Sequence, residues 1–362
     1  MQRSTSIAFI SLVLGTPLPR RLVVRSNSAI ARSSPTTTPV NFKKPHWSID
    51  HTSPLFFLGS CFAETLSDTL AAKKFQIFAN NHGILFNPVS LSTALRYAAT
   101  GEKFDDDRHV FQDKLDTTIY HSWTHHSSFS SSSRAQLIED INAKNVQAHC
   151  FMKQSEVLFL TLGTAFVHEL SDSTIVANCH KQPAKLFNKR LLKLEEAVTA
   201  LDDVLMDMDP RLQVVITVSP VRHTREGVEE NSRSKAVLLL TAHELVDKYP
   251  DRVRYFPTYE LFIDELRDYR WYDADMLHPS KAAKKLVFDI FADTFLSDGA
   301  VSATKLIDSI HVDMQHRPLL QKSLSYKRHL ERTLAKTQQA QKEHYVDFSK
   351  ELETLQSILA TL

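Results

Sequence analysis

The stretch PLFFLGSCFA, residues 54–63, is a short apolar run that ends at Gly59 and passes into a helical pattern. An uninterrupted apolar run of this kind is typical of a strand that is buried on both faces of a parallel sheet. The residues that follow, 62–73, carry apolar side chains at helical spacing. We therefore expect a buried strand, a turn at Gly59 and a helix that starts directly after the turn.

The same alternation of strand and helix continues along the chain. Further apolar runs predict strands over 75–78, 157–162, 212–218 and 252–256. Helical patterns are found over 91–98, 191–205, 232–248 and 281–296, whereas the serine run 130–133 is expected to be a solvated loop. The expected fold class is α/β, a three-layer αβα sandwich around a parallel sheet. In such sheets the functional groups gather at the carboxyl ends of the strands.

Composition excludes several classes of protein. Lys and Arg number 43 and Asp and Glu 42, so the net charge of +1 gives no global argument for binding nucleic acid or an acidic membrane surface. The three cysteines are too few, and wrongly spaced, for a disulfide scaffold or a zinc ribbon. We therefore expect no metal site and no cofactor, and the oligomeric state is not predicted.

The two ends of the chain differ from the middle. No acidic residue precedes Asp50, and the first segment is rich in Arg and Ser, which predicts a transit peptide for a plastid or mitochondrion. A short apolar run over 7–14 leaves a secretory signal open, and an untargeted tail is the third interpretation. Leucines at steps of mostly three and four residues over 304–362 predict helices. The expected division is 1–45 as a targeting or disordered segment, 46–300 as the α/β domain and 301–362 as a helical extension.

The turn Gly59-Ser60-Cys61 is a candidate for nucleophilic chemistry. A helix N-terminus carries positive potential, which lowers a thiol pKa and favours a developing oxyanion. The alternative interpretation is structural: Ser60 caps the helix and Cys61 packs beneath it.

A second candidate is the segment from Asp275 to Ser280, ahead of the last helix of the domain. A carboxylate three residues before an imidazole can bond Nδ1–H of His278 and leave Nε2 free as a general base. The structural alternative is a surface loop in which Ser280 caps the next helix. Gly83 and the pair Gly163-Thr164 follow strand candidates, where backbone N–H groups and a small hydroxyl can form an oxyanion hole.

Taken together, these segments resemble the GSCFA family, whose motif stands here as Gly59-Ser60-Cys61-Phe62-Ala63. Other segments that carry the resemblance, in order, are 80–88, 160–166, 218–223, 231–238, 265–270 and 275–280. The order of nucleophile, small donors and Asp-x-x-His is also similar to that of SGNH (GDSL-like) hydrolases. The resemblance implies a flavodoxin-like sheet and hydrolysis of acyl esters of carbohydrates or lipids.

The SGNH nucleophile is usually the serine of Gly-Asp-Ser. An ungapped comparison puts Ser60 at the aspartate position and Cys61 at the serine position, so the resemblance favours Cys61 as nucleophile with Ser60 as the second candidate. His278 and Asp275 would complete the catalytic set.

The resemblance also departs from the SGNH pattern at the oxyanion hole. The family's Gly-x-Asn-Asp block reads Gly163-Thr164-Ala165 here, and Ala165 has no side-chain donor. Thr164, Asn87, Asn80 or backbone N–H groups are the candidate replacements.

Arg222 and His223, which follow the predicted strand at 212–218, are candidates for contacts with substrate. Arg222 is expected to bind an anionic group or to form a structural ion pair, and His223 to line the cleft or to be an ordinary hydrogen-bonded histidine. The function predicted is an acyl-ester hydrolase, with an acyltransferase or an inactive binding protein on the same scaffold as alternatives. Its partner would be a small-molecule, glycan or lipid ester and not a nucleic acid, and no segment is apolar enough to span a membrane.

Overall fold

The computed structural model describes residues 37–362, except 106–108, 321 and 345. A parallel sheet in the order β11-β10-β6-β1-β2 forms its centre. The strands are β1 (Leu55–Gly59), β2 (Ile77–Ala79), β6 (Val157–Leu162), β10 (Gln213–Val218) and β11 (Val253–Tyr255). Counted along the chain within this sheet, the order is 2-1-3-4-5, which is the flavodoxin-like order. The predicted α/β class and the parallel sheet are confirmed.

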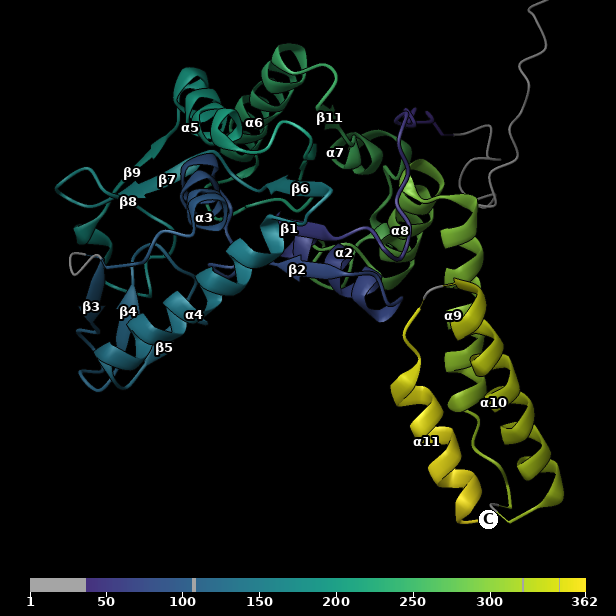
Figure 1. Ribbon diagram of the computed structural model, residues 1–362. Helices are drawn as coiled ribbons and strands as arrows, with labels where there is room; N and C mark the ends of the chain where they lie inside the picture. Colours follow the sequence, from purple (N-terminus) through teal and green to yellow (C-terminus); the bar gives the residue numbers. More distant parts are fainter. Residues whose placement is uncertain (1–36, 106–108, 321, 345) are drawn as a thin grey trace, which may run out of the picture.

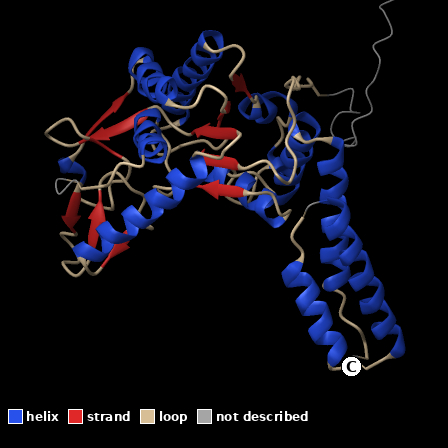
Figure 2. Ribbon diagram, in the orientation of Figure 1, coloured by secondary structure: helices blue, strands red, loops and turns tan. Residues whose placement is uncertain are grey.

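Helices cover both faces of the sheet, and every side chain of β1 and β6 is therefore buried. Phe56 and Leu58 of β1 point into one hydrophobic cluster, and Leu55 and Phe57 into the other. The first cluster is closed by α3 (Pro88–Thr100), α4 (Arg134–Met152), α5 (Leu194–Asp207) and α6 (Val228–Lys248). The second is closed by α2 (Cys61–Ala72), α8 (Lys281–Phe295) and η2 (Leu261–Glu265), which follows the short helix α7 (Thr258–Glu260). Figure 2 shows the strands enclosed between these two groups of helices.

The strand order reverses between β1 and β6, which are hydrogen-bonded neighbours with Gly59 opposite Thr161. From β1 the chain passes to β2 on one side, whereas β6 leads to β10 on the other side. In open parallel sheets, ligands bind in the crevice outside the carboxyl ends of the strands at such a switch point. The fold therefore directs attention to the turn that follows β1.

Two small antiparallel sheets are attached to this centre and were not predicted. One consists of β3 (Val110–Gln112), β4 (Tyr120–Ser122) and β5 (Ser130–Ser131), and the other of β7 (Phe166–Glu169), β8 (Ile175–Val176) and β9 (Asn188–Leu191). Turns η1 (Ala184–Leu186) and η3 (Tyr269–Trp271) complete the connections. The expected loop at 130–133 is therefore wrong for Ser130 and Ser131, which pair with β4.

The predicted C-terminal helices are confirmed as α9 (Asp298–Met314), α10 (Leu324–His344) and α11 (Ser349–Ala360). They extend away from the sheet as an arm with a small hydrophobic cluster of its own, which includes Ile310 and Phe348 (Figure 1). Lys74, after α2, forms an ion pair with Glu351 of α11 at 2.9 Å and so ties the arm to the α/β domain.

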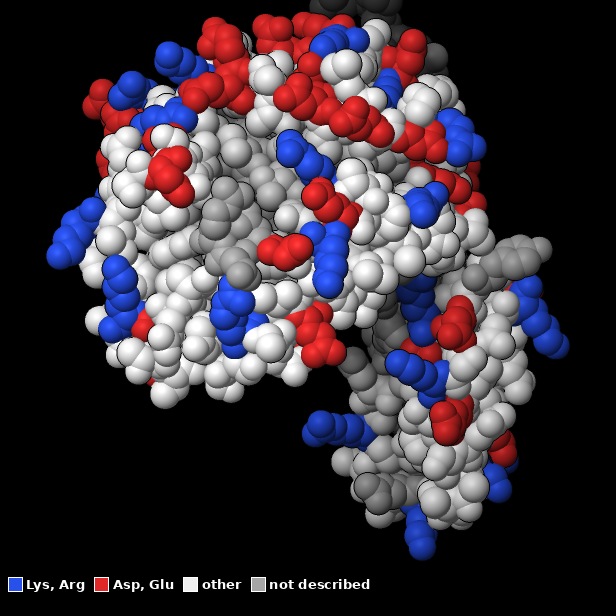
Figure 3. All heavy atoms as spheres, turned by 60° about the vertical axis from the view of Figure 1, so that its left-hand side comes forward, with Lys and Arg blue, Asp and Glu red and all other residues white. Residues whose placement is uncertain are grey.

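The expected targeting segment falls mainly on residues 1–36, which lie outside the described residues. Just after them, the Val40 N–H donates to Glu265 Oε2 at 2.9 Å, and the Phe42 ring lies 5.2 Å from that of Phe256. The chain is therefore packed against the domain before residue 46. Among the helices that the structure describes, none is both long and apolar enough to cross a membrane. Basic and acidic side chains are interspersed over the face drawn in Figure 3, in keeping with the near-zero net charge.

Candidate active site at the carboxyl edge of the sheet

The turn between β1 and α2 is held by close packing and a helix cap. Gly59 has φ +150°, and a Cβ placed on it would lie 2.4 Å from the carbonyl oxygen of Thr161. Ser60, only 1% exposed, is the N-cap of α2, and its Oγ accepts the N–H of Phe62 at 3.3 Å. Cys61 is the first helical residue and is partly exposed. The structural role weighed for Ser60 is therefore present, and Cys61 is the more accessible of the two candidate nucleophiles.

Some neighbours of Cys61 raise the pKa of its thiol and others lower it. Burial raises the pKa of the thiol, as does the carboxylate of Glu64. The N–H groups of Cys61 and Phe62 at the start of α2, and the charge of Lys235, lower the pKa. The net effect is a raised pKa, so the group is a protonated thiol at neutral pH and needs a base to become a nucleophile.

The segment around Asp275 forms the expected couple. Asp275 Oδ2 lies 2.5 Å from Nδ1 of His278, while its Oδ1 accepts the N–H groups of Leu277 and His278, both at 2.9 Å. The N–H and the ring of His278 lower the pKa of Asp275 far below its usual range, so the carboxylate stays charged and orients the imidazole. Ser280 caps α8, as the structural alternative predicted. The same loop therefore holds both a helix cap and the hydrogen-bonded pair Asp275–His278.

No described residue shares a hydrogen bond with Nε2 of His278, and neither Ser60 nor Cys61 is bonded to that ring. The Asp275–His278 loop is nevertheless attached to the same edge of the sheet. Arg222, just beyond β10, donates to the carbonyl oxygen of Met276 at 3.2 Å, and its guanidinium lies 5.2 Å from the Tyr272 ring. Arg222 thus contacts the loop that carries His278, while its Nε has no hydrogen-bond partner among the described residues.

His223 follows Arg222 in the loop after β10. Burial is the main cause that lowers its pKa, to about 4, and the charges of Lys235 and His278 act in the same direction. Its backbone N–H donates to Asn231 at 3.0 Å, and its ring meets Phe86 edge-on. His223 is therefore neutral at pH 7, and the charges of both Lys235 and His278 disfavour its protonation.

Lys235 of α6 is the residue of this site that the sequence did not single out. It is 1% exposed, and its Nζ donates to the carbonyl oxygens of Gly163 and Ser219, each at 2.7 Å. Burial lowers its pKa to about 7, whereas Cys61 acts to raise it. The available signal was its place on the buried stripe of α6, three residues before Leu238 and four after Asn231.

Most of the proposed oxyanion donors are already committed elsewhere. The Gly83 N–H donates to Asn80 O at 2.9 Å, and the N–H groups of Gly163 and Thr164 both donate to Phe86 O. Asn87 is the N-cap of α3 and bonds Ser90 through both its oxygen and its nitrogen. These backbone N–H groups, and one donor of the Asn87 amide, are therefore used in hydrogen bonds within the fold.

The hydroxyl of Thr164 is also engaged, since Oγ1 lies 3.0 Å from Ser234 Oγ and accepts the N–H of Phe166. Asn80 differs from the other candidates. Its Oδ1 accepts the Gly59 N–H at 3.0 Å, while its Nδ2 is buried without a hydrogen-bond partner among the described residues. A buried amide with a spare donor beside the Cys61 turn is a candidate for contact with substrate.

Replacing Asn80 by alanine is expected to lower the free energy of unfolding by about 2 kcal/mol, because the buried Gly59 N–H loses its acceptor. Asn80 also has φ +50°, a conformation that asparagine tolerates better than alanine does. Urea unfolding measures the change. Ser173→Ala is the control, since Ser173 has φ +67° in an exposed turn. An equal loss in both variants would mean that the Asn80–Gly59 bond contributes nothing.

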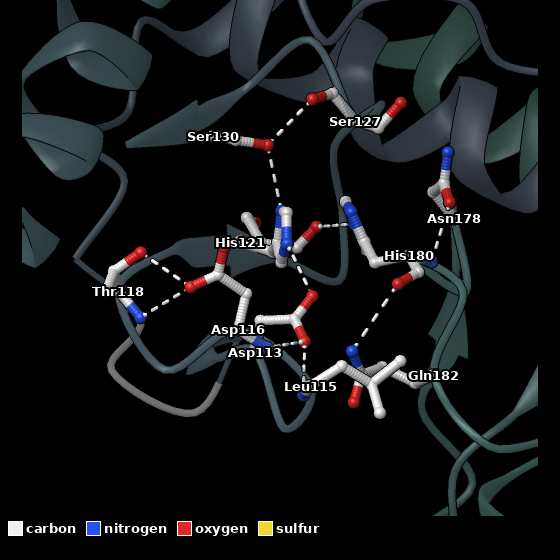
Figure 4. A network of polar contacts seen from close by, with 11 residues as sticks. Asp113, Leu115, Asp116, Thr118, His121, Ser127, Ser130, Asn178, His180 and Gln182 are labelled. Carbon is white, nitrogen blue, oxygen red and sulfur yellow. Dashed lines mark hydrogen bonds and ion pairs between the residues drawn. The ribbon is translucent and has the colours of Figure 1, made fainter. Parts of the chain in front are cut away.

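A second polar cluster lies in the small sheet β3-β4-β5 (Figure 4). His121 lies 3.0 Å from Asp113 through Nε2 and 2.8 Å from Ser130 Oγ through Nδ1, and Ser130 donates to Ser127 O at 2.7 Å. His121 and Ser130 are opposite each other on β4 and β5, so strand pairing accounts for their contact. Because Ser130 lies in a strand, with no helix N-terminus to stabilise an anion, we assign this cluster to holding the small sheet together.

Within the described ranges, no group of three or more His, Cys, Asp or Glu side chains is arranged to hold a metal ion. The candidate functional groups near the carboxyl edge of the parallel sheet are thus a thiol, an aspartate-oriented imidazole and a buried ammonium. The fold is that of a doubly wound α/β protein, and the Cys61 turn follows β1 at its topological switch point.

Residues 54–291 match the profile of the GSCFA family, and residues 307–361 match that of the GSCFA domain protein, C-terminal domain. The chain therefore belongs to the GSCFA family. No curated protein matches the chain.

Proposed function

We propose that this protein is an SGNH-like acyl hydrolase that acts on an ester of a carbohydrate or lipid, with Cys61 as nucleophile, His278 as base and Asp275 as its orienting group. One observation carries the proposal: the Cys61 turn and the Asp275–His278 couple lie at the same edge of the sheet. Lys235 bonds the ends of β6 and β10 and interacts with Cys61, and Arg222 ties the end of β10 to the His278 loop.

The chemistry follows from the protonation states. Cys61 is a thiol at rest, so His278 must accept its proton as the Sγ–carbon bond forms. Asp275 stabilises the resulting imidazolium, which then gives the proton to the leaving alcohol. Water, activated by the same imidazole, hydrolyses the thioester. Hydrogen bonds of catalytic groups are often long or absent in unliganded sites, which accommodates the open Nε2 of His278.

An ester panel of p-nitrophenyl acetate and butyrate tests the proposal with the full chain. Cys61→Ala and His278→Ala are expected to reduce turnover to the rate in buffer. Ser60→Ala is expected to keep most of the turnover but to lose about 1 kcal/mol of stability, because it loses the cap of α2. Cys150→Ala, which removes an exposed thiol on α4, is the matched control for loss of a cysteine.

Turnover that survives His278→Ala would contradict the assignment of the base, and turnover lost only in Ser60→Ala would make Ser60 the nucleophile. The missing bond between His278 and Cys61 favours one competing role, a binding protein on the same scaffold. Absence of turnover across a broad ester panel, with tight binding of an ester or glycan, would decide for that role.

A further inference from the structure

A buried lysine is costly unless its charge is used or neutralised. Lys235 is enclosed at the carboxyl edge of the sheet, and none of the ion pairs that the structure describes includes it. An ammonium has three donors. Two of them go to Gly163 and Ser219, and the third has no hydrogen-bond partner among the described residues. The two carbonyls hold the head group in place and leave one N–H free.

The group that holds this ammonium follows the strand next to the one that leads to Cys61. Gly59 pairs with Thr161 at the carboxyl ends of adjacent strands, and Cys61 and Gly163 each follow that pair by two residues. Lys235 Nζ is bonded to the carbonyl oxygen of Gly163. The charge interaction between Lys235 and Cys61, which acts on both groups, agrees with this placement.

An acyl-transfer site needs a donor for the oxygen that becomes negative. The backbone N–H groups of Gly83, Gly163 and Thr164 are used within the fold. Asn80 Nδ2 remains as a donor beside the turn, but it carries no charge. Glu64, the first acidic residue of α2, raises the pKa of Cys61 and cannot serve as a donor. His223 is neutral and faces Lys235 from the loop after β10. Lys235 is thus the cation that the interior of the site offers to negative charge at Cys61.

We propose that the Lys235 ammonium stabilises negative charge at Cys61, first on the thiolate and then on the oxyanion of the acyl intermediate. This inference rests on the proposed function. When Sγ bonds to the carbonyl carbon, the π electrons move to oxygen, and Lys235 donates its free N–H to that oxygen. Collapse of the intermediate restores the carbonyl and breaks the bond to the alcohol, which takes its proton from His278. Lys235 keeps all its protons throughout and forms no covalent bond.

The first test needs no ester substrate. Alkylation of Cys61 by iodoacetamide, mapped by mass spectrometry, reports its thiolate fraction. At pH 6.5, where Lys235 still carries most of its charge, Lys235→Met is expected to slow this alkylation about tenfold, because the cation beside the sulfur is lost. Lys248→Met, on the same helix but at an exposed ion pair with Asp202, is the matched control and should leave the rate unchanged. An unchanged rate in Lys235→Met would overturn the inference.

A wild-type measurement covers the case in which Lys235→Met does not fold. A cation facing Cys61 should favour the anion iodoacetate over neutral iodoacetamide by several-fold, relative to the same ratio at the exposed Cys150. This preference should decline above about pH 7, where Lys235 loses its proton. Equal ratios at Cys61 and Cys150 at every pH would show that no cation faces Cys61, and would overturn the inference.

Turnover then separates this inference from the proposed function. Lys235→Met is expected to reduce ester turnover about 10²- to 10³-fold, the usual loss for one oxyanion donor. In Lys235→Ala, added methylamine should restore part of the rate, which a purely structural role would not allow. Turnover that needs Cys61 but not Lys235 would overturn the inference alone. The proposed function would fail alone if Lys235→Met slowed the alkylation of Cys61 while the wild type hydrolysed no ester. The interaction between Lys235 and Cys61 would then still be supported.

Discussion

Alanine at position 59 is expected to lower the free energy of unfolding by about 4 kcal/mol and to abolish any activity of the Cys61 turn. Two causes add. The backbone at Gly59 has φ +150°, which side chains disfavour by roughly 1–3 kcal/mol. The new Cβ would also lie 2.4 Å from the carbonyl oxygen and 2.8 Å from the nitrogen of Thr161, so β1 and β6 would have to separate, at about 1–3 kcal/mol. Urea unfolding monitored by circular dichroism measures the loss.

Two other glycines provide controls that isolate each cause. Gly227 has φ +91°, but no atom of the described chain would lie within 4 Å of an added Cβ, so Gly227→Ala should show only the backbone cost. Gly299 lies in α9, where an added Cβ would meet only the Ser297 hydroxyl at 3.9 Å, so Gly299→Ala should be neutral or stabilising by up to about 1 kcal/mol. If Gly59→Ala unfolded at the same urea concentration as Gly227→Ala, the close approach of β1 to Thr161 would be refuted.

The central sheet could be predicted because its strands are short, uninterrupted apolar runs. The run at 157–162 coincides with β6, and the run at 212–218 differs from β10 by one residue. The small sheets escaped prediction for a physical reason. Strands such as β5 and β9 are only partly buried and mainly polar, so they lack the apolar pattern that reveals a strand, and they depend on pairing with distant segments.

The site was predicted in part for similar reasons. The contact between Asp275 and His278 is local, so a spacing of three residues was enough to foresee it. Which N–H groups remain free could not be foreseen, because the partners of Gly163 and Gly83 are set by the tertiary fold. Lys235 was overlooked because a lysine in a helical pattern ordinarily lies at the surface, and only the buried stripe of α6 shows that it faces inward.

The stability of the protein should rise with pH relative to that of Lys235→Met. Burial lowers the pKa of Lys235 from 10.5 to about 7 in the folded chain, whereas the unfolded chain has the ordinary lysine value. Between these values the unfolded chain binds more protons, so the wild-type free energy of unfolding increases with pH across the window. Each pH unit contributes about 1.4 kcal/mol, and the difference between wild type and variant should change by about 3 kcal/mol from pH 7 to about 9.5.

Comparison of the two proteins cancels every other titrating group that they share. His223, which faces Lys235, is neutral throughout this range, and the raised pKa of the Cys61 thiol keeps it protonated over most of it. The carbonyls of Gly163 and Ser219 lose their donor in Lys235→Met, but that loss does not depend on pH and shifts the difference without changing its slope. Urea unfolding at half-unit pH intervals gives the slope. A flat difference across the whole window would mean that Lys235 keeps its ordinary proton affinity in the fold, and burial would then not be what controls its charge.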